Sequence, residues 1–386
     1  FKLAKALEPY TLNDYPSLDG VRNHIITMIH NNRQRHQEGL ITDFKKKSFD
    51  INFSFVKLGS GSMGGKARSL AFINSLLSNG TIKQKFQNVN ISVPKSLIIA
   101  SDEYDKFLAT NKLANLIHEC DNETILQNFL SAKVSKKIFA KLKLFLSHVK
   151  NPITVRSSSL FEDSQNQPFA GIYETYMLPN NHKDLNIRLQ SLCNAIKAIY
   201  ASVFYQEAKT YFKNTSFRHE EEKMSIIIQG IVGDSHNNYF YPLIAGVAQS
   251  YNYYPISHMK PKDGIANIVF GFGKAVVEGN RTFRFCPKYP AILPQFPTQR
   301  DLVKYTQKKF FALNMNSNTF NLATINKVER FPLLNITDAE KHETLQHVAG
   351  VYSPENDIVY DGMFRDGIKI INFSNILKNN TFPLSD

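Results

Sequence analysis

Gly59-Ser60-Gly61-Ser62-Met63-Gly64-Gly65-Lys66 is the stretch that constrains the fold of this chain most strongly. It follows a strand-like segment, Phe53–Leu58, and precedes a segment, Lys66–Leu77, with helical spacing of Leu70, Ile73, Leu76 and Leu77. Glycines between a strand and a helix let the backbone approach a phosphate at the helix N-terminus, where Lys66 adds a positive charge. The stretch therefore predicts a phosphate-binding loop. A glycine turn with a solvent-facing lysine is the structural alternative.

The first part of this loop, Gly59–Gly64, matches the G-x-G-x-x-G pattern of dinucleotide-binding folds. Those folds need an Asp or Glu about 20 residues further on to bind the ribose. None occurs from Ile51 to Ser101, so Arg68 or Lys83 would have to bind the 2′-phosphate of NADP instead. An NADP-binding oxidoreductase domain therefore stays as an alternative function.

Two further glycine-rich motifs do not fit the loop. A Walker A loop would need a glycine in place of Ser60 and a metal-binding Ser or Thr in place of Ala67. Protein kinases carry H-R-D and D-F-G motifs, and neither occurs in the sequence. Both classes of protein are therefore excluded.

A second polar cluster follows another predicted strand, Ile153–Val155, which leads into Arg156. Three serines and the acids Glu162 and Asp163 come next, and then the segment Phe169–Thr175 (F-A-G-I-Y-E-T). An arginine at a strand end can bind two phosphate oxygens, and a loop with Gly and Thr can close over them. Pairing of Arg156 with one of the two acids is the structural alternative.

Elsewhere the sequence predicts strands mixed with long helices, as in α+β or α/β proteins. Ser96–Ala100 is predicted as a strand that ends at a helix cap, Ser101, with Asp102 and Glu103 favourably placed in the first helical turn. Asp184–Ala208 is predicted as one long amphipathic helix. Further strand-like segments are Met224–Gln229, Leu243–Ala248 and Asn267–Phe270.

A chain of 386 residues is expected to form two lobes. The charged run Arg218–Lys223 marks a change in character, so we predict the lobe boundary near residue 220. Residues 11–50 are polar, and we predict a helical lead-in over residues 1–50, a first lobe over residues 51–220 and a second lobe over residues 221–386.

The chain is basic, with a formal net charge of +13, and this excess suits a polyanionic ligand such as a nucleotide. The densest run of lysines, Ser131–Lys150, also carries an apolar side, so we predict a solvated helix surface there. No zinc-finger, RNA-recognition or basic-zipper pattern occurs. We therefore expect no nucleic-acid partner.

No stretch of the sequence reaches the roughly 18 consecutive apolar residues of a membrane span. The three cysteines, Cys120, Cys193 and Cys286, are far apart and odd in number, which fits a reducing compartment. We therefore expect a cytoplasmic protein with no membrane partner. Because the chain begins at Phe1 without a signal-peptide pattern, we also expect it to be part of a longer protein. No sequence feature sets an oligomeric state.

Taken together, the motifs resemble the N-terminal nucleotide-binding domain of phosphoenolpyruvate synthase and pyruvate phosphate dikinase, a group that includes water dikinases and rifampin phosphotransferases. The blocks occur in the family's order: Gly64–Leu70 (G-G-K-x-x-x-L), Val93–Ala100 (V-P-x-x-x-x-I/T), Val155–Asp163 (V-R-S-S-x-x-x-E-D), Phe169–Thr175 (F-A-G-x-x-x-T), Gln229–Val232 (Q-x-M/I-V) and Gly271–Gly279 (G-L-G-E-x-V-V-x-G).

The resemblance implies an α+β fold of the ATP-grasp type, in which two lobes with mixed sheets and flanking helices hold ATP. It implies that Lys66 and Arg156 bind the ATP phosphates and act in catalysis. It also implies that the phosphates are lined by Gly64, Gly65, Gly171 and Thr175. The hinge that binds adenine would contain Gln229 and Ile231.

The chain also departs from the family pattern. Lys274 stands where the family usually has Glu, and Gly246–Ser250 lacks the aromatic residue and the Thr of the family's G-V-x-F-T segment. The family's strand with a metal-binding Glu, and its phosphorylated His in T-S-H-A-A, do not occur before Asp386. Ile256–Met259 resembles the T-S-H-A-A motif only superficially. The scattered histidines show no ligand spacing, so we expect no metal site in this chain.

The resemblance therefore implies the ATP-binding part of a phosphotransferase. ATP would phosphorylate a His in another domain, and the group would pass to pyruvate or a related acceptor. Mg²⁺ would bridge the phosphates, held by carboxylates expected beyond Asp386. We expect this chain alone to bind nucleotide without turnover. A non-catalytic nucleotide sensor is the second alternative.

Overall fold

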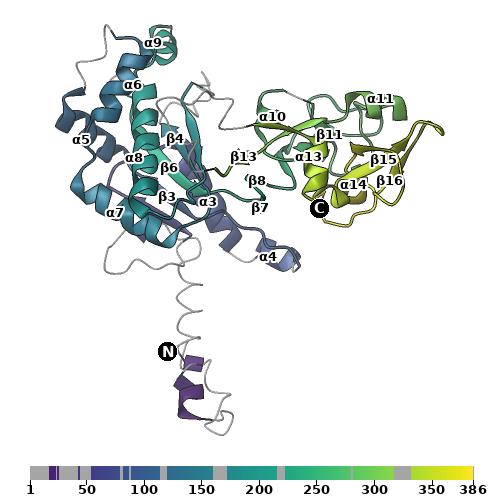
Figure 1. Cartoon of the computed structure of the whole chain (residues 1–386), viewed down its shortest axis with the longest axis horizontal. Coiled ribbons are helices and arrows are strands. Elements are labelled where there is room, and N and C mark those ends of the chain that lie inside the picture. The colour runs from purple at the N-terminus through teal and green to yellow at the C-terminus, as the bar shows by residue number, and fades with distance from the viewer. Residues whose placement is uncertain are drawn as a thin grey trace. The chain divides into compact units, whose positions relative to one another are not determined.

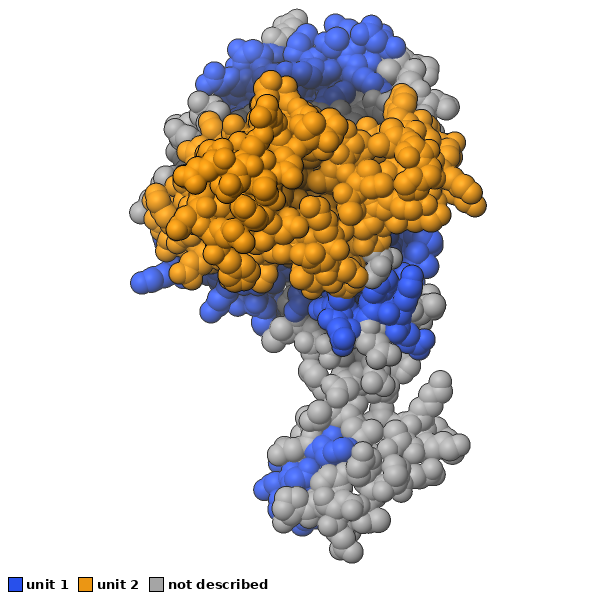
Figure 2. Space-filling model, turned by 90° about the vertical axis from the view of Figure 1, so that its right-hand side faces the viewer, with its two compact units in different colours: residues 1–231, 321–323 blue, residues 232–320, 324–386 orange. Residues whose placement is uncertain are grey.

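The computed structural model describes residues 17–22, 24–25, 42–43, 54–78, 81–86, 88–113, 120–159, 172–214, 222–279, 281–316 and 332–385. The chain forms two compact units (Figure 2): residues 1–231 with 321–323 make unit 1, and residues 232–320 with 324–386 make unit 2. Each unit combines sheets with helices (Figure 1), which confirms the predicted α+β, ATP-grasp-like fold class. The lobe boundary near residue 220 and the lead-in over residues 1–50 stay predictions.

The strands of unit 1 form one sheet: β1 (Thr42–Asp43), β2 (Phe55–Leu58), β3 (Ser96–Ile99), β4 (Ile153–Ser159), β5 (Thr175–Leu178) and β6 (Met224–Gly230). Their order is β1-β2-β3-β6-β4-β5. The first three strands run parallel, whereas β3, β6, β4 and β5 pair antiparallel in turn. Because dinucleotide-binding folds have a mostly parallel sheet, this pairing argues against the NADP-binding alternative.

Helices cover both faces of this sheet: α3 (Gly64–Ser78), α4 (Thr81–Lys85), α5 (Ser101–Asn111), α6 (Asn122–Ser131), α7 (Lys136–His148), α8 (Leu185–Ser202) and α9 (Gln206–Lys213). On one face, Ala67 and Ala71 of α3 pack against Ile98 and Ile227 of the sheet. Side chains alternate along a strand, so Ile99 projects to the other face, towards α5, α7 and α8 (Figure 1).

The helix predicted over Lys66–Leu77 is confirmed as α3, but its buried side differs from the predicted apolar spacing. Ala67 and Ala71 are buried, whereas Ile73 and Leu76 are 45% and 43% exposed. Small side chains at the contact let the start of this helix lie close to the sheet. Ile73 and Leu76 therefore project towards solvent, whereas Leu77 is buried and Leu70 packs partly against the core.

The prediction of one long helix over Asp184–Ala208 is wrong, because the chain forms α8 and α9 there. Asp184 caps α8 by accepting a hydrogen bond from the Asn186 amide at 2.8 Å. The backbone is extended again at Tyr205. This break places the ring of Phe204 in the core, 5.4 Å from that of Phe129.

The strand predicted over Ile153–Val155 continues to Ser159, as β4. Ser157–Ser159 pair with the first residues of β6 and are buried. The sequence predicted Arg156 at the end of this strand, but Arg156 lies in its middle.

Within the described residues, the strands of unit 2 form four small sheets. They are β7 (Asp234–His236), β8 (Tyr239–Tyr241) and β13 (Leu313–Asn314); β9 (Ala245–Gln249), β10 (Ile265–Val269) and β11 (Phe283–Phe285); β12 (Lys309–Phe311) and β14 (Leu333–Asn335); and β15 (Ala349–Ser353), β16 (Ile358–Asp361) and β17 (Ile368–Ile371).

The α-helices described in unit 2 are short: α10 (Lys274–Val277), α11 (Gln299–Tyr305), α13 (Ile336–Lys341) and α14 (Ser374–Leu377). Aromatic side chains join these pieces. The ring of Tyr241 lies 4.8 Å from that of Phe310 and 5.6 Å from that of Phe270. Unit 2 thus has an aromatic core of its own.

Candidate functional site

The second half of the glycine loop is fastened to the sheet by two serines. The Ser158 hydroxyl donates to the Met63 carbonyl at 2.8 Å and accepts from the Ala67 amide at 3.1 Å. The Ser225 hydroxyl donates to the Ser62 carbonyl at 2.8 Å. The motif around Arg156 and the glycine loop therefore form one connected structure, which fixes the start of α3 over β4 and β6.

Gly64 is required at the point where the loop meets β4. Its φ is +74°, and a Cβ there would overlap the carbonyl oxygen of Ser158. The Gly64 amide donates to the Ser62 hydroxyl at 3.2 Å. Within the described residues the Gly65 amide has no hydrogen-bond acceptor, so it is a donor of this turn that could bind a ligand.

The first half of the loop binds a carboxylate of the protein itself. Asp102 accepts hydrogen bonds from the amides of Ser60 and Gly61 at 3.1 and 2.9 Å. Burial acts to raise the pKa of Asp102, but hydrogen bonds from Lys106 and from these two amides outweigh it and lower the pKa to about 2. The amides predicted to face a phosphate are therefore already occupied in this half of the loop.

The prediction that Ser101 caps the following helix is wrong. Ala100 occupies the cap position of α5, and no side chain caps the helix there. The Ser101 hydroxyl instead accepts a hydrogen bond from the Ser62 amide at 3.0 Å. Ser101 and Asp102 thus both hold the glycine loop, a role that their position after a strand did not reveal.

Arg156 and Thr175 lie directly opposite each other in the ladder between β4 and β5. Opposite residues of an antiparallel pair project to the same face of the sheet. Ser158, two residues after Arg156, bonds the start of α3, so this is the face that α3 covers. Arg156 and Thr175 therefore share a face with the helix that carries Lys66.

Arg156 is partly exposed and Thr175 is exposed. Within the part of the chain that the structure describes, the Arg156 side chain has no hydrogen bond or ion pair. Its predicted alternative partners, Glu162 and Asp163, lie outside the described residues, as does Gly171. Arg156 is thus placed where an anionic ligand could pair with it.

Gln229 lies near the end of β6, opposite Thr154 on one side and Ser96 on the other. Its side-chain nitrogen donates to the Ser96 hydroxyl at 3.0 Å. The Ile231 amide donates to the Pro152 carbonyl at 3.0 Å. Both predicted hinge residues therefore have protein partners, and an adenine contact by the Ile231 amide would require its bond to open.

Thr154 is a candidate that the sequence pattern did not single out. It is 7% exposed, and its buried hydroxyl has no hydrogen-bond partner among the residues that the structure describes. It lies two residues before Arg156 and therefore projects to the same face. An unpartnered buried hydroxyl costs about 1–3 kcal/mol, which is typical of a site that serves something other than stability.

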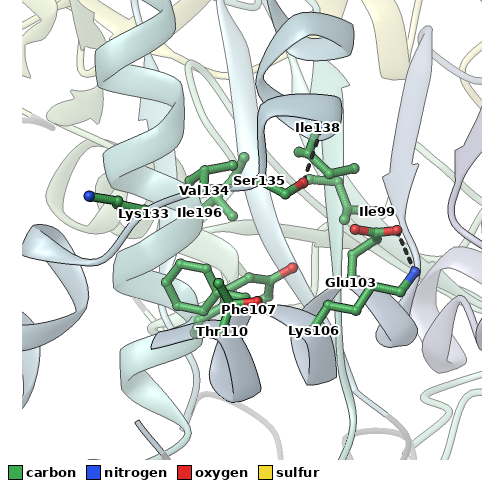
Figure 3. A pocket seen from close by; sticks show the side chains of 11 residues that line it. Ile99, Glu103, Lys106, Phe107, Thr110, Lys133, Val134, Ser135, Ile138 and Ile196 are labelled. Atoms are coloured by element: carbon green, nitrogen blue, oxygen red, sulfur yellow. Dashed lines mark hydrogen bonds and ion pairs between the residues drawn. The ribbon is translucent and has the colours of Figure 1, made fainter. Parts of the chain in front are cut away.

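A small hollow in unit 1, shown in Figure 3, lies on the opposite face of the sheet. Ile99, Phe107 and Ile138 line it, and an ion pair of 2.8 Å between Glu103 and Lys106 lies at its edge. Its volume is about 50 Å³, whereas one water molecule occupies about 30 Å³ of liquid. The hollow is therefore too small for a nucleotide.

Lys274, the residue that departs from the family pattern, begins α10 in unit 2. Its ammonium group lies 3.4 Å from the Glu278 carboxylate and 4.8 Å from the centre of the Phe311 ring. The reversed charge is thus accommodated by a carboxylate and an aromatic face within the same unit.

A family model described as "pyruvate phosphate dikinase, AMP/ATP-binding domain" matches residues 60–349. The chain belongs to this family. The match covers the loop, β4 and β6 in unit 1 and most of unit 2, so it includes every residue assigned above to phosphate or adenine binding. The predicted family is therefore confirmed, and the chain is a member of an ATP-binding phosphotransferase family.

Curated relatives carry consistent names. The "uncharacterized phosphotransferase YvkC" of Bacillus subtilis is 29% identical over 199 residues, which is 51% of this chain and 21% of that protein. The phosphoenolpyruvate synthase of Aeropyrum pernix is 23% identical, over 50% of this chain and 24% of its own length. A probable phosphoenolpyruvate synthase of Archaeoglobus fulgidus is 27% identical, over 33% and 14%. The chain thus spans a quarter or less of the length of these relatives.

Membrane and metal features complete the description. None of the described helices is long and apolar enough to cross a membrane. Among the described residues, no group of three or more His, Cys, Asp or Glu side chains is arranged to hold a metal ion.

Proposed function

We propose that this chain binds ATP on the α3 side of the unit 1 sheet, with the phosphates at Lys66 and Arg156. The observation that carries the proposal is the shared face of Arg156, Thr175 and the start of α3. Membership of an AMP/ATP-binding family supports it.

Each side chain would have a distinct role in binding. The planar guanidinium of Arg156 suits two phosphate oxygens at once, whereas the Lys66 ammonium acts as a point charge. The Thr175 hydroxyl, the Gly65 amide and the backbone at Gly64 and Gly171 would complete the phosphate contacts. Because phosphoryl transfer depends mainly on positioning and charge neutralisation, these groups would also contribute to catalysis.

The adenine would lie further along the same face, near Gln229, Thr154 and Ile231. Gln229 pairs with Thr154, which lies two residues before Arg156, or about 7 Å away along the strand direction. That spacing leaves room for a ribose between phosphates and base.

The acceptor part of the proposal extends beyond this chain. We infer that ATP phosphorylates a His in another domain: a P–O bond of ATP breaks, the nucleotide leaves with the electron pair of that bond, and a P–N bond to the imidazole forms. The phosphoryl group then passes to pyruvate or a related acceptor. The relatives named phosphoenolpyruvate synthase support this, since the chain corresponds to less than a quarter of each.

The resemblance also implies Mg²⁺, which prefers carboxylate oxygens. Lys66, Arg156 and Thr175 supply no carboxylate, and the described residues hold no group of three or more candidate ligands. The site described here does not fit a bound Mg²⁺ by itself. The proposed roles of Lys66 and Arg156 therefore do not depend on one.

A non-catalytic nucleotide sensor is the second candidate. Lys274 favours it, because a cation held by Glu278 and Phe311 replaces the family's usual carboxylate. Phosphohistidine formed from labelled ATP in the intact protein would favour the enzyme. Stable ATP binding without such transfer would favour the sensor.

Calorimetric titration of the chain with ATP tests the proposal, with NADPH as the competing ligand. We expect Lys66→Gln and Arg156→Gln each to weaken ATP binding by roughly ten- to a hundredfold. Lys143→Gln, on the exposed side of α7, and Arg300→Gln, in unit 2, are matched controls that should bind like the parent chain. Equal ATP affinity in the folded site variants and the controls would refute the assignment.

A further inference from the structure

Unit 2 contains a basic pocket that the proposed ATP site does not use. Its volume is about 290 Å³. Its described lining combines cationic with apolar side chains and one amide: Arg281, Lys308 and Lys309, then Ala275, Phe311 and Leu333, and Gln307.

The backbone around this pocket is held firmly. Phe311 pairs with Leu333 in the ladder between β12 and β14, and Lys309 pairs with Asn335 at its other end. The buried Gln307 amide accepts from the Phe270 amide at 2.9 Å and donates to the carbonyls of Phe270 and Lys309 at 2.8 and 3.0 Å. The backbone at the start of β12, from which the side chains of Lys308 and Lys309 project, is therefore fixed.

The positive charges of the pocket lack carboxylate partners. Among the described residues, neither Lys308 nor Lys309 forms an ion pair. The Arg281 guanidinium donates to the Lys304 carbonyl at 3.1 Å, and no acidic side chain is among the described residues that line the pocket. Converging cations beside apolar walls focus a positive potential, which attracts anions.

A hollow in unit 1 offers an internal comparison. It has a volume of about 240 Å³ and includes lysines among its lining residues, but Asp102 and Glu103 line it too. Lys106 there lies 2.7 and 2.8 Å from the two carboxylates. Two carboxylates thus offset part of the positive charge of that hollow, whereas no carboxylate is among the described residues that line the unit 2 pocket.

We propose that the unit 2 pocket is a second anion site, which binds a phosphate-bearing small molecule. Arg281 would bind two phosphate oxygens, Lys308 and Lys309 would supply point charges, and the wall formed by Phe311 and Leu333 would contact an apolar part of the ligand. The terminal phosphates of ATP and a separate phosphorylated ligand share this chemistry. The inference does not rest on the proposed ATP site in unit 1.

Titration of the full chain with pyrophosphate tests the site. We expect Arg281→Gln, and the double change Lys308→Gln with Lys309→Gln, to weaken pyrophosphate binding about tenfold or more. Lys262→Gln removes an exposed cation of unit 2 away from the pocket and should leave binding unchanged. Matching thermal unfolding curves show that each variant is folded.

A second arm separates this site from the one in unit 1. Pyrophosphate binding to the pocket should persist when Lys66 and Arg156 are both changed to Gln. Displacement of this bound pyrophosphate by ATP identifies ATP as the ligand, and simultaneous binding identifies a separate phosphorylated ligand. Absence of pyrophosphate binding, or binding that the pocket variants leave intact, would overturn the proposal.

Discussion

Arg156 and Thr175 face each other across the β4–β5 ladder, on the side of the sheet where α3 begins. The pairing depends on β4 continuing through Ser159, since a strand that ended at Val155 would leave Arg156 in a loop. The strand thus fixes the backbone of Arg156 and the face to which its side chain projects. The long side chain itself becomes ordered when a ligand binds.

The fixed position of Arg156 makes the shape of its side chain important. We predict that Arg156→Lys, which keeps the charge, lowers ATP affinity about tenfold, because an ammonium cannot form two parallel hydrogen bonds to phosphate. Calorimetric titration measures the change, and Arg300→Lys in unit 2 is the control. If Arg156→Lys binds ATP as tightly as the parent chain, Arg156 contributes charge alone.

Ser158 connects the two motifs, so its removal should affect both stability and binding. Ser158→Ala leaves the Met63 carbonyl and the Ala67 amide without their partner. We predict a loss of about 1–3 kcal/mol in the free energy of unfolding and weaker ATP binding. Urea unfolding gives the first value and titration the second.

Ser147→Ala is the matched control for this change, because that hydroxyl is exposed and bonds only within the last turns of α7. A Ser158→Ala chain that binds ATP normally despite its lower stability would show that the loop keeps its shape without this anchor.

Asp102 should make stability depend on acid. Its folded pKa of about 2 lies below the ordinary value of 3.8, so its contribution to stability is fully present above about pH 4 and is lost as the pH falls towards 2. After allowance for solvent screening, we expect about 1 kcal/mol. Asp102→Asn should remove this part of the pH dependence in unfolding experiments between pH 2 and 5. Asp184→Asn is the control. If the Asp102→Asn and Asp184→Asn chains lose the same stability on acidification, Asp102 has no special role in the pH dependence.

Removal of the Thr154 hydroxyl should not destabilise the chain, unlike removal of a hydroxyl that has a structural role. Because its buried hydroxyl has no partner, Thr154→Val should leave the free energy of unfolding unchanged or raise it by about 1 kcal/mol. Thermal and urea unfolding measure this. A loss of stability larger than that of Thr124→Val, on an exposed turn of α6, would contradict the assignment.

The sequence was most informative where a motif and a local structure coincide. The glycines before Lys66 predicted the loop and α3, the family motifs predicted the ATP-grasp class, and the lysines of α7 predicted its exposed side, with Ile138 and Leu142 buried beneath. Such features depend on neighbours in the chain, so spacing and residue type reveal them.

Features that depend on distant contacts could not be predicted in this way. Ser101 has the residue type and position of a helix cap, but its hydroxyl bonds Ser62, 39 positions earlier. Asp102 pairs with Lys106 of its own helix, as spacing allows, but it also accepts a hydrogen bond from Gly61, 41 positions earlier. The length of β4 follows from its pairing with β6, since serines have little intrinsic preference for strands.

The glycine loop binds the carboxylate of Asp102, and this contact affects how the loop would recognise a phosphate. Two loop amides already bind this internal anion, so recognition must rely mainly on the long side chains of Lys66 and Arg156. Interactions between mobile surface charges are screened by dissolved ions, whereas hydrogen bonds from buried amides are screened far less. Nucleotide affinity in this chain should therefore fall steeply as ionic strength rises, which would make it sensitive to the salt content of its surroundings.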